Sequence, residues 1–190
     1  LLRGDAIDAA ALRAGALAQT QELAVAFADL VGFTWLGGQV APDELGRVAR
    51  RLEEVAAEVI RPPVRLVKTI GDAVLLISPE PGALVESALA LVAAAEAQAQ
   101  DEGFPQLRAG VALGETQEHG GDVYGHAVNL ASRLTAIARP GSVLTDRRVR
   151  DALREEFRWS FAGERRIKGI GEELRLYRAR LPEPDSSHVE

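Results

Sequence analysis

Residues 64–77 read VRLVKTIGDAVLLI, and this stretch decides the fold. Two apolar strands, 64–69 and 73–78, flank the dipeptide Gly71-Asp72. Glycine followed by aspartate fits a two-residue hairpin turn of type II′, because glycine tolerates the positive φ that the first turn position requires. We therefore predict an antiparallel hairpin with a carboxylate at its tip.

Helical patterns stand on both sides of this hairpin. Residues 41–60 place apolar side chains at helical spacing and begin with a proline and two acids, and prolines 62 and 63 stop the pattern. Residues 82–100 form a second, alanine-rich helical pattern. Buried strands are predicted at 22–30 and 106–115. The order β-α-β-β-α-β predicts an α+β fold with a ferredoxin-like core, in which the helices cover one face of an antiparallel sheet.

Further elements follow this core. A Gly-rich connection at 117–125, with a short strand at 122–124, leads to a third helix at 126–138. A strand at 142–146 and a hairpin at 157–180 add C-terminal strands to the sheet. Residues 21–180 therefore form one domain.

The ends of the chain differ from this domain. Residues 1–20 are Ala- and Leu-rich and indicate a helical lead-in or linker from an upstream domain. Because the chain lacks methionine even at position 1, we expect it to be a piece of a longer protein. The polar residues 181–190 are predicted to be a disordered tail.

Composition limits the possible functions. The net charge of −6 argues against a nucleic-acid binder, which usually carries a basic surface. With no cysteine in the chain, disulfides, thiolate metal sites and cysteine nucleophiles are excluded. No signal peptide and no uncharged apolar stretch of about 18 residues is visible. We expect a cytoplasmic domain, and leave open a membrane tether in an upstream part.

Two acids stand at strand boundaries. Asp29 ends the first predicted strand, and Asp72 lies in the hairpin turn. In this topology the two positions converge, and two converging carboxylates favour a hard divalent cation such as Mg²⁺ or Mn²⁺. After Asp29, the backbone N–H groups of residues 31–34, which include Phe33 and Thr34, could face phosphate oxygens at a helix start. The structural alternative is a helix cap at Asp29 and an ordinary turn residue at Asp72.

Polar groups elsewhere suggest anion chemistry. Asn129 and Arg133 lie four residues apart, on one face of the third helix, where a guanidinium could stabilise a phosphoryl group. The alternative is a solvated helix edge. Lys68 and Lys168 are the two lysines among 22 cationic residues. Lys168 lies in a Gly-flanked, flexible segment that could fold over a ligand or remain an ordinary charged loop.

Five ordered segments carry a resemblance to a known family. They are FADLVGFT (27–34), VKTIGDAVLL (67–76), RAGVALG (108–114), GDVYGHAVNLASRL (121–134) and RRIKGIG (165–171). Together they resemble the catalytic domain of class III nucleotidyl cyclases over about residues 21–178. The similarity is to bacterial, particularly actinobacterial, cyclases in which one kind of chain carries every catalytic position.

The resemblance implies the class III cyclase fold and a head-to-tail homodimer with two shared sites. Asp29 and Asp72 match the aspartates that bind two divalent cations per site, Mg²⁺ or Mn²⁺. The other groups would come from the partner protomer. Among them, Lys68 matches the lysine that recognises adenine, and Asp122 matches its acidic partner.

The same resemblance assigns three more residues. Asn129 matches the asparagine that orients the ribose, Arg133 the transition-state arginine, and Lys168 the lysine that holds the triphosphate. The implied reaction is that of a phosphorus–oxygen lyase, which converts ATP to 3′,5′-cyclic AMP and pyrophosphate. Two metal ions assist the attack of the ribose 3′-hydroxyl on the α-phosphate.

Base choice follows from hydrogen-bond chemistry. Lysine can donate to N1 of adenine, and aspartate can accept from its 6-amino group. Guanine has a donor and an acceptor in the opposite places, so neither hydrogen bond can form with it. The pair Lys68 and Asp122 therefore favours ATP. The alternatives are a guanylyl or relaxed-specificity cyclase, and a regulatory nucleotide-binding pseudo-cyclase that signals by dimerisation.

Overall fold

The computed structural model describes residues 20–33, 37–38, 41–102 and 104–182. Within these residues the chain forms one eight-stranded sheet and four helices. The strands are β1 (Thr20–Leu30), β2 (Arg65–Ile70), β3 (Ala73–Ser78), β4 (Leu107–His119), β5 (Asp122–Tyr124), β6 (Val143–Asp146), β7 (Arg158–Arg166) and β8 (Glu173–Arg180). The helices are α3 (Pro42–Val59), α4 (Pro81–Glu102), α5 (His126–Ile137) and α6 (Arg147–Ala152). The predicted lead-in and tail lie outside the described residues, apart from residues 20, 181 and 182.

The sheet confirms the predicted core. Its strand order is β2-β3-β1-β4-β6-β8-β7, and the first four strands are antiparallel in the ferredoxin-like arrangement. Outside this core, β6 runs parallel to β4. The reason is topological: α5 crosses the sheet between these strands, and such a crossover returns the chain in the same direction.

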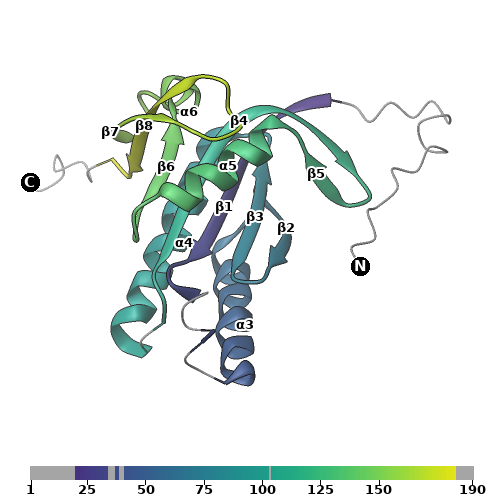
Figure 1. Cartoon of the computed structure of the whole chain (residues 1–190), viewed down its shortest axis with the longest axis vertical. Coiled ribbons are helices and arrows are strands. Elements are labelled where there is room, and N and C mark those ends of the chain that lie inside the picture. Colours follow the sequence, from purple (N-terminus) through teal and green to yellow (C-terminus); the bar gives the residue numbers. More distant parts are fainter. Residues whose placement is uncertain (1–19, 34–36, 39–40, 103, 183–190) are drawn as a thin grey trace, which may run out of the picture.

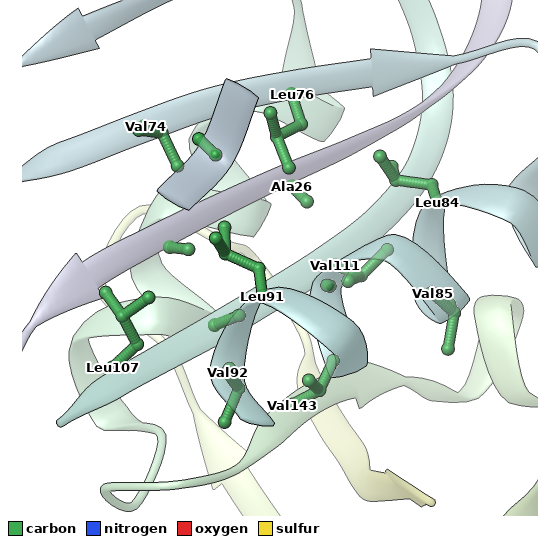
Figure 2. Packing of buried hydrophobic residues seen from close by; sticks show 14 of the residues in the cluster. Ala26, Val74, Leu76, Leu84, Val85, Leu91, Val92, Leu107, Val111 and Val143 are labelled. Atoms are coloured by element: carbon green, nitrogen blue, oxygen red, sulfur yellow. The ribbon is translucent and has the colours of Figure 1, made fainter. Parts of the chain in front are cut away.

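Helices α3 and α4 cover one face of the sheet. Alternate residues of β1 (Ala24, Ala26, Ala28, Leu30) pack with Leu52 and Val55 of α3 and with Leu84, Leu91 and Val92 of α4. Figure 2 shows the α4 side chains directed at Val74, Leu76, Val111 and Val143 of the strands. Residues Pro81–Gln100 of α4 are long and apolar enough to cross a membrane by composition, with a mean hydropathy of 1.2. Their packing on the sheet is that of a core helix.

Helices α3 and α4 share one face, as predicted for the core, and the added helix α5 covers the opposite face. The intervening residues of β1, Leu23 and Val25, pack there with Leu130 and Leu134 of α5. This face carries the polar groups of interest because Asp29 follows the same alternation as Leu23 and Val25.

The hairpin brings its tip to the end of β1. Gly71 has a φ of 63°, and Asp72 has no positive φ, as a type II′ turn requires. Asp29 pairs with Ala73 in the β1–β3 register, and the N–H of Leu30 donates to the carbonyl oxygen of Asp72 at 3.1 Å. The predicted convergence of Asp29 and Asp72 is confirmed at the level of the backbone.

Strand β4 is longer than predicted. It continues through the expected Gly-rich connection to His119, turns at Gly120 and Gly121, and returns as β5. Both glycines have positive φ, 60° and 81°, which closes a two-residue turn. The result is an arm that extends beyond the rest of the sheet, next to β2 (Figure 1).

Gly110 sets the distance between α5 and the sheet. A β-carbon at this position of β4 would lie 2.3 Å from the backbone nitrogen of Thr135 and 2.6 Å from the carbonyl oxygen of Ala131. No side chain fits between the strand and the helix. The hydroxyl of Thr135 donates to the carbonyl oxygen of Phe27 at 3.1 Å, which also ties the helix to β1.

The substitution Gly110→Ala tests this close approach. We expect it to lower the free energy of unfolding by about 3 kcal/mol, because the methyl group has backbone rather than flexible side chains to displace. Urea denaturation measures the change. The control is Gly46→Ala in α3, where the β-carbon meets only the Arg50 guanidinium at 3.5 Å. That change should be neutral or stabilise by about 0.5–1 kcal/mol, and equal effects at the two glycines would contradict the packing argument.

Candidate functional site

The aspartates at the end of β1 and at the hairpin tip face each other. Both side chains are half-buried, and the carboxyl groups of Asp29 and Asp72 lie within hydrogen-bonding reach. Among the described residues no third histidine, aspartate or glutamate joins them in a metal-binding group. Within the described residues, the protein therefore supplies two carboxylates at this point.

Burial and neighbouring charges shift the pKa of Asp72. Burial raises the pKa of Asp72 above its ordinary value, and the negative charge of Asp29 raises it further. The positive charge of Arg108 opposes this shift. A second cation near the carboxylates would also lower the pKa of Asp72. Two carboxylates are therefore ligands that fit a hard divalent ion.

Arg108 is a residue that sequence reasoning missed. It lies opposite Asp29 in the β1–β4 register, and its Nη2 and Nε contact Asp29 Oδ2 at 3.0 and 3.3 Å. Its Nη1 also donates to the carbonyl oxygen of Ala136 in α5 at 2.9 Å. Arg108 thus links β1, β4 and α5. In the sequence, Arg108 was visible only as a single charged residue at the start of an apolar strand. Its partner Asp29 could not be identified without the register between β1 and β4.

Lys68 and Asp122 form an ion pair between β2 and β5. The side chains are 40% and 27% exposed, so the pair lies at the surface but is not fully solvated. The hydrogen bond from Lys68 holds the pKa of Asp122 below its usual range, and the N–H of Val123, which donates to Asp122 Oδ1 at 2.8 Å, lowers it further. One donor and one charged acceptor are therefore held side by side at neutral pH.

Helix α5 presents Asn129 and Arg133 away from its buried face. Asn129 is exposed and Arg133 is half-buried. The guanidinium of Arg133 lies against the turn that carries Lys168, since a β-carbon at Gly169 would stand 3.0 Å from its Nη2. Two cationic side chains therefore share one region.

The turn around Lys168 is anchored, which corrects the expectation of a flexible segment. Ile167 and Ile170 are buried at 7% and 6% exposure against the α5 side of the sheet. The N–H of Ile170 donates to the carbonyl oxygen of Ile167 at 2.9 Å, which closes the turn. Two apolar anchors thus hold Lys168 at the surface.

The predicted phosphate-facing backbone after Asp29 is only partly available. The N–H of Val31 donates to the carbonyl oxygen of Gln106 at 2.8 Å, so it is not free for a phosphate. The side chain of Phe33 packs on the opposite core, with α3 and α4. Thr34 lies outside the described residues.

Within one chain these residues fall into three groups. They are the aspartate pair, the Lys68–Asp122 pair, and Arg133 with the Lys168 turn. In the described part of the chain, no hydrogen bond or ion pair joins the aspartates to Asn129, Arg133 or Lys168. Sites that transfer phosphoryl groups typically combine carboxylates, which bind a metal cation, with arginine or lysine side chains, which bind the phosphates.

Comparison with known proteins decides the family. The profile of the adenylate and guanylate cyclase catalytic domain matches residues 16–178. The chain belongs to this cyclase family. A protein named pH-sensitive adenylate cyclase from Mycobacterium tuberculosis is 46% identical over 186 residues, which cover 95% of this chain and 46% of that protein.

Other cyclases support the assignment. An adenylate cyclase from Streptomyces griseus is 47% identical over 123 residues, which cover 64% of this chain and 30% of that protein. The chain thus spans less than half the length of these curated relatives. A crystal structure described as an adenylate/guanylate cyclase/hydrolase from Silicibacter pomeroyi superposes with a TM-score of 0.72 and 26% identity, over 87% of this chain and 99% of that one. The predicted class III cyclase fold and its actinobacterial relatives are confirmed.

The ion pair between Arg108 and Asp29 makes a prediction about the cyclase domain. Replacing Arg108 by methionine should raise the pKa of Asp72, because the positive charge that lowers it is removed. Carbon-13 NMR titration of the carboxyl groups measures the shift. Arg147→Met, which removes one of the arginine partners of Asp151 on α6, is the control and should leave the pKa of Asp72 unchanged. An unchanged Asp72 titration in the Arg108 variant would refute the proposed charge coupling.

Proposed function

We propose that this domain is the catalytic domain of an adenylyl cyclase, which converts ATP to 3′,5′-cyclic AMP and pyrophosphate. The observation that carries the proposal is the Lys68–Asp122 pair. It sets a hydrogen-bond donor beside an acceptor, in the polarity that the edge of adenine requires. The curated relatives named adenylate cyclase support the same substrate.

Base selection would follow from an exchange of partners. In the free chain the lysine and the aspartate satisfy each other, so a base has to separate them. Adenine replaces the ion pair with an acceptor at N1 and a donor at the 6-amino group. Guanine offers a donor to the lysine and an acceptor to the aspartate, which leaves two polar groups without partners. A guanylyl cyclase would need an acid where Lys68 stands.

Asp29 and Asp72 are the residues that would hold divalent metal ions. A site with two carboxylates suits Mg²⁺ or Mn²⁺, because these ions commonly complete their coordination with water and substrate phosphates. We assign two ions to each site. When bound, they would lower the pKa of the ribose 3′-hydroxyl and neutralise phosphate charge.

The chain's own residues would position the nucleotide for an in-line displacement. The 3′-hydroxyl loses its proton to solvent as its oxygen forms a bond to the α-phosphorus. The bond from that phosphorus to the bridging oxygen breaks, and pyrophosphate leaves with the electron pair. Asn129 would hydrogen-bond the ribose and fix the direction of attack. Arg133 and Lys168 would bind the negative charge that builds on the phosphates, so no protein nucleophile is required.

A complete site would require two chains. The aspartate pair and the α5 groups are not joined within one chain, and a head-to-tail homodimer would bring the aspartates of one protomer to Asn129, Arg133 and Lys168 of the other. Two identical sites would result. The backbone amides of Phe33 and Thr34 would contact the phosphates. We further propose a cytoplasmic catalytic domain regulated by an upstream domain.

Mixing two inactive variants tests the shared site. Asp29→Ala and Arg133→Ala should each lose about a hundredfold or more in activity, because each removes a charged group that contacts phosphate or metal. Mixed in equal amounts, they should recover about a quarter of wild-type activity, since half of the dimers carry one site without either mutation. Cyclic AMP production after subunit exchange is the measurement.

A matched mixture serves as the control. Asp29→Ala mixed with Asp72→Ala should recover nothing, because both substitutions damage the metal half of a site. Recovery in both mixtures, or in neither when mixed dimers are shown to form, would rule out the shared arrangement.

Exchanging the base-recognising pair tests the choice of nucleotide. The double variant Lys68→Glu/Asp122→Cys should lower the ratio of kcat/KM for ATP to that for GTP by at least about tenfold, because the donor and acceptor now suit guanine. Steady-state turnover of both nucleotides provides the ratio, and the thermal midpoint serves as the folding control. If ATP turnover is unaffected, these residues do not read the base.

A further inference from the structure

A second ion pair joins β2 to the arm formed by β4 and β5, beside the Lys68–Asp122 pair. Arg65 of β2 contacts Glu118 of β4, with Nη2 and Oε2 2.5 Å apart. Strand β2 makes its ladder hydrogen bonds to β3, and β5 makes its own to β4, so backbone pairing does not connect β2 to the arm among the described strands. The β1–β4 ladder holds the arm as far as Gln117, and beyond it the ion pairs of Arg65 and Lys68 connect the arm to β2.

A β-bulge makes this second contact possible. Residues 65 and 68 are three apart, so strict alternation would direct them to opposite faces of the sheet. The β2–β3 register shifts at Val67: Arg65 pairs with Ile77 and Lys68 with Leu75. Ile77 and Leu75 both face the α5 side, and Val67 packs there as well. The extra residue thus puts both cations on the face that the arm approaches.

Glu118 is held from two sides. Its Oε1 accepts from Nε2 of Gln21 on β1 at 2.9 Å, while its Oε2 accepts from Arg65. In the arm, Glu118 pairs with Val123, the neighbour of Asp122. A fixed Glu118 therefore fixes the part of the arm that carries the acceptor of the base-recognising pair.

The exposure of this pair points away from a role in stability. The side chains of Arg65 and Glu118 are 50% and 34% exposed, and ion pairs this open to water add little to folding. Base recognition is more sensitive, because one base edge has to meet Lys68 and Asp122 together and a displacement of about 1 Å spoils a bidentate contact.

We propose that Arg65 and Glu118, brought to one face by the Val67 bulge, are positioning residues that set the preference for ATP over GTP. The proposal rests on the proposed function, because it takes Lys68 and Asp122 as the groups that read the base. Arg65 and Glu118 act through that pair and do not contact the base.

Three variants test the positioning role. Glu118→Gln and Arg65→Glu each remove the ion pair, and Arg65→Glu/Glu118→Arg restores it with reversed charges. We expect each single change to lower the ATP-to-GTP ratio of kcat/KM by about tenfold. The loss should come mainly from a higher KM for ATP, with kcat nearly unchanged, because the base is misplaced while the phosphates keep their positions. The charge-reversed double variant should recover most of the ratio.

A matched control separates positioning from loss of an ion pair in general. Glu54→Gln makes the same chemical change in α3, where Glu54 pairs with Arg51 at 3.0 Å and is 60% exposed. Because α3 covers the face away from the arm, this variant should keep the wild-type ratio. All variants should unfold at the wild-type temperature.

The outcomes distinguish the two claims. If the wild-type chain turns over neither ATP nor GTP with Mn²⁺, the proposed function fails. If the wild type prefers ATP and the Arg65 and Glu118 variants keep that preference, the positioning role is overturned and the proposed function stands. A loss of preference that the charge-reversed variant fails to recover would also overturn it, since the ion pair would then not be the cause.

Discussion

The close approach of helix α5 to strand β4 is the constraint on which the rest of the site depends. Gly110 leaves no side chain between them, so the helix backbone lies directly on the sheet. This contact fixes the outer face of α5, which carries Asn129 and Arg133. It also brings the carbonyl oxygen of Ala136 within reach of Arg108, whose guanidinium binds Asp29. The close approach at Gly110 thus brings together groups from β1, β4 and α5.

Two ion pairs hold the charged side chains of the candidate site. Asp29 is paired with Arg108, and Lys68 with Asp122. Each pair limits the cost of placing charge at a partly buried position. In the proposed mechanism a ligand supplies new partners for these charges: a cation joins the aspartates, and a base enters between lysine and aspartate. The free chain is therefore electrostatically prepared for both kinds of ligand.

Much of this arrangement could be predicted from the sequence. The hairpin at 64–77 between two helices predicted the ferredoxin-like core, and its glycine predicted the turn that brings Asp72 to Asp29. The Val67 bulge could not be foreseen, because alternation in VRLVK does not reveal an extra residue. Arg108 was missed for a related reason: its partner depends on the register of β1 and β4. Local patterns predict elements, whereas contacts between distant strands need the assembled sheet.

The central claim is that this chain makes cyclic AMP from ATP, at sites built from two copies. The most direct measurement incubates the purified chain with ATP or GTP and Mn²⁺, over a range of protein concentrations, and quantifies cyclic nucleotide and pyrophosphate. The account predicts equal amounts of cyclic AMP and pyrophosphate, little cyclic GMP, and an activity per chain that rises with concentration. Greater production of cyclic GMP, or no cyclic product from either nucleotide at any concentration, would contradict it.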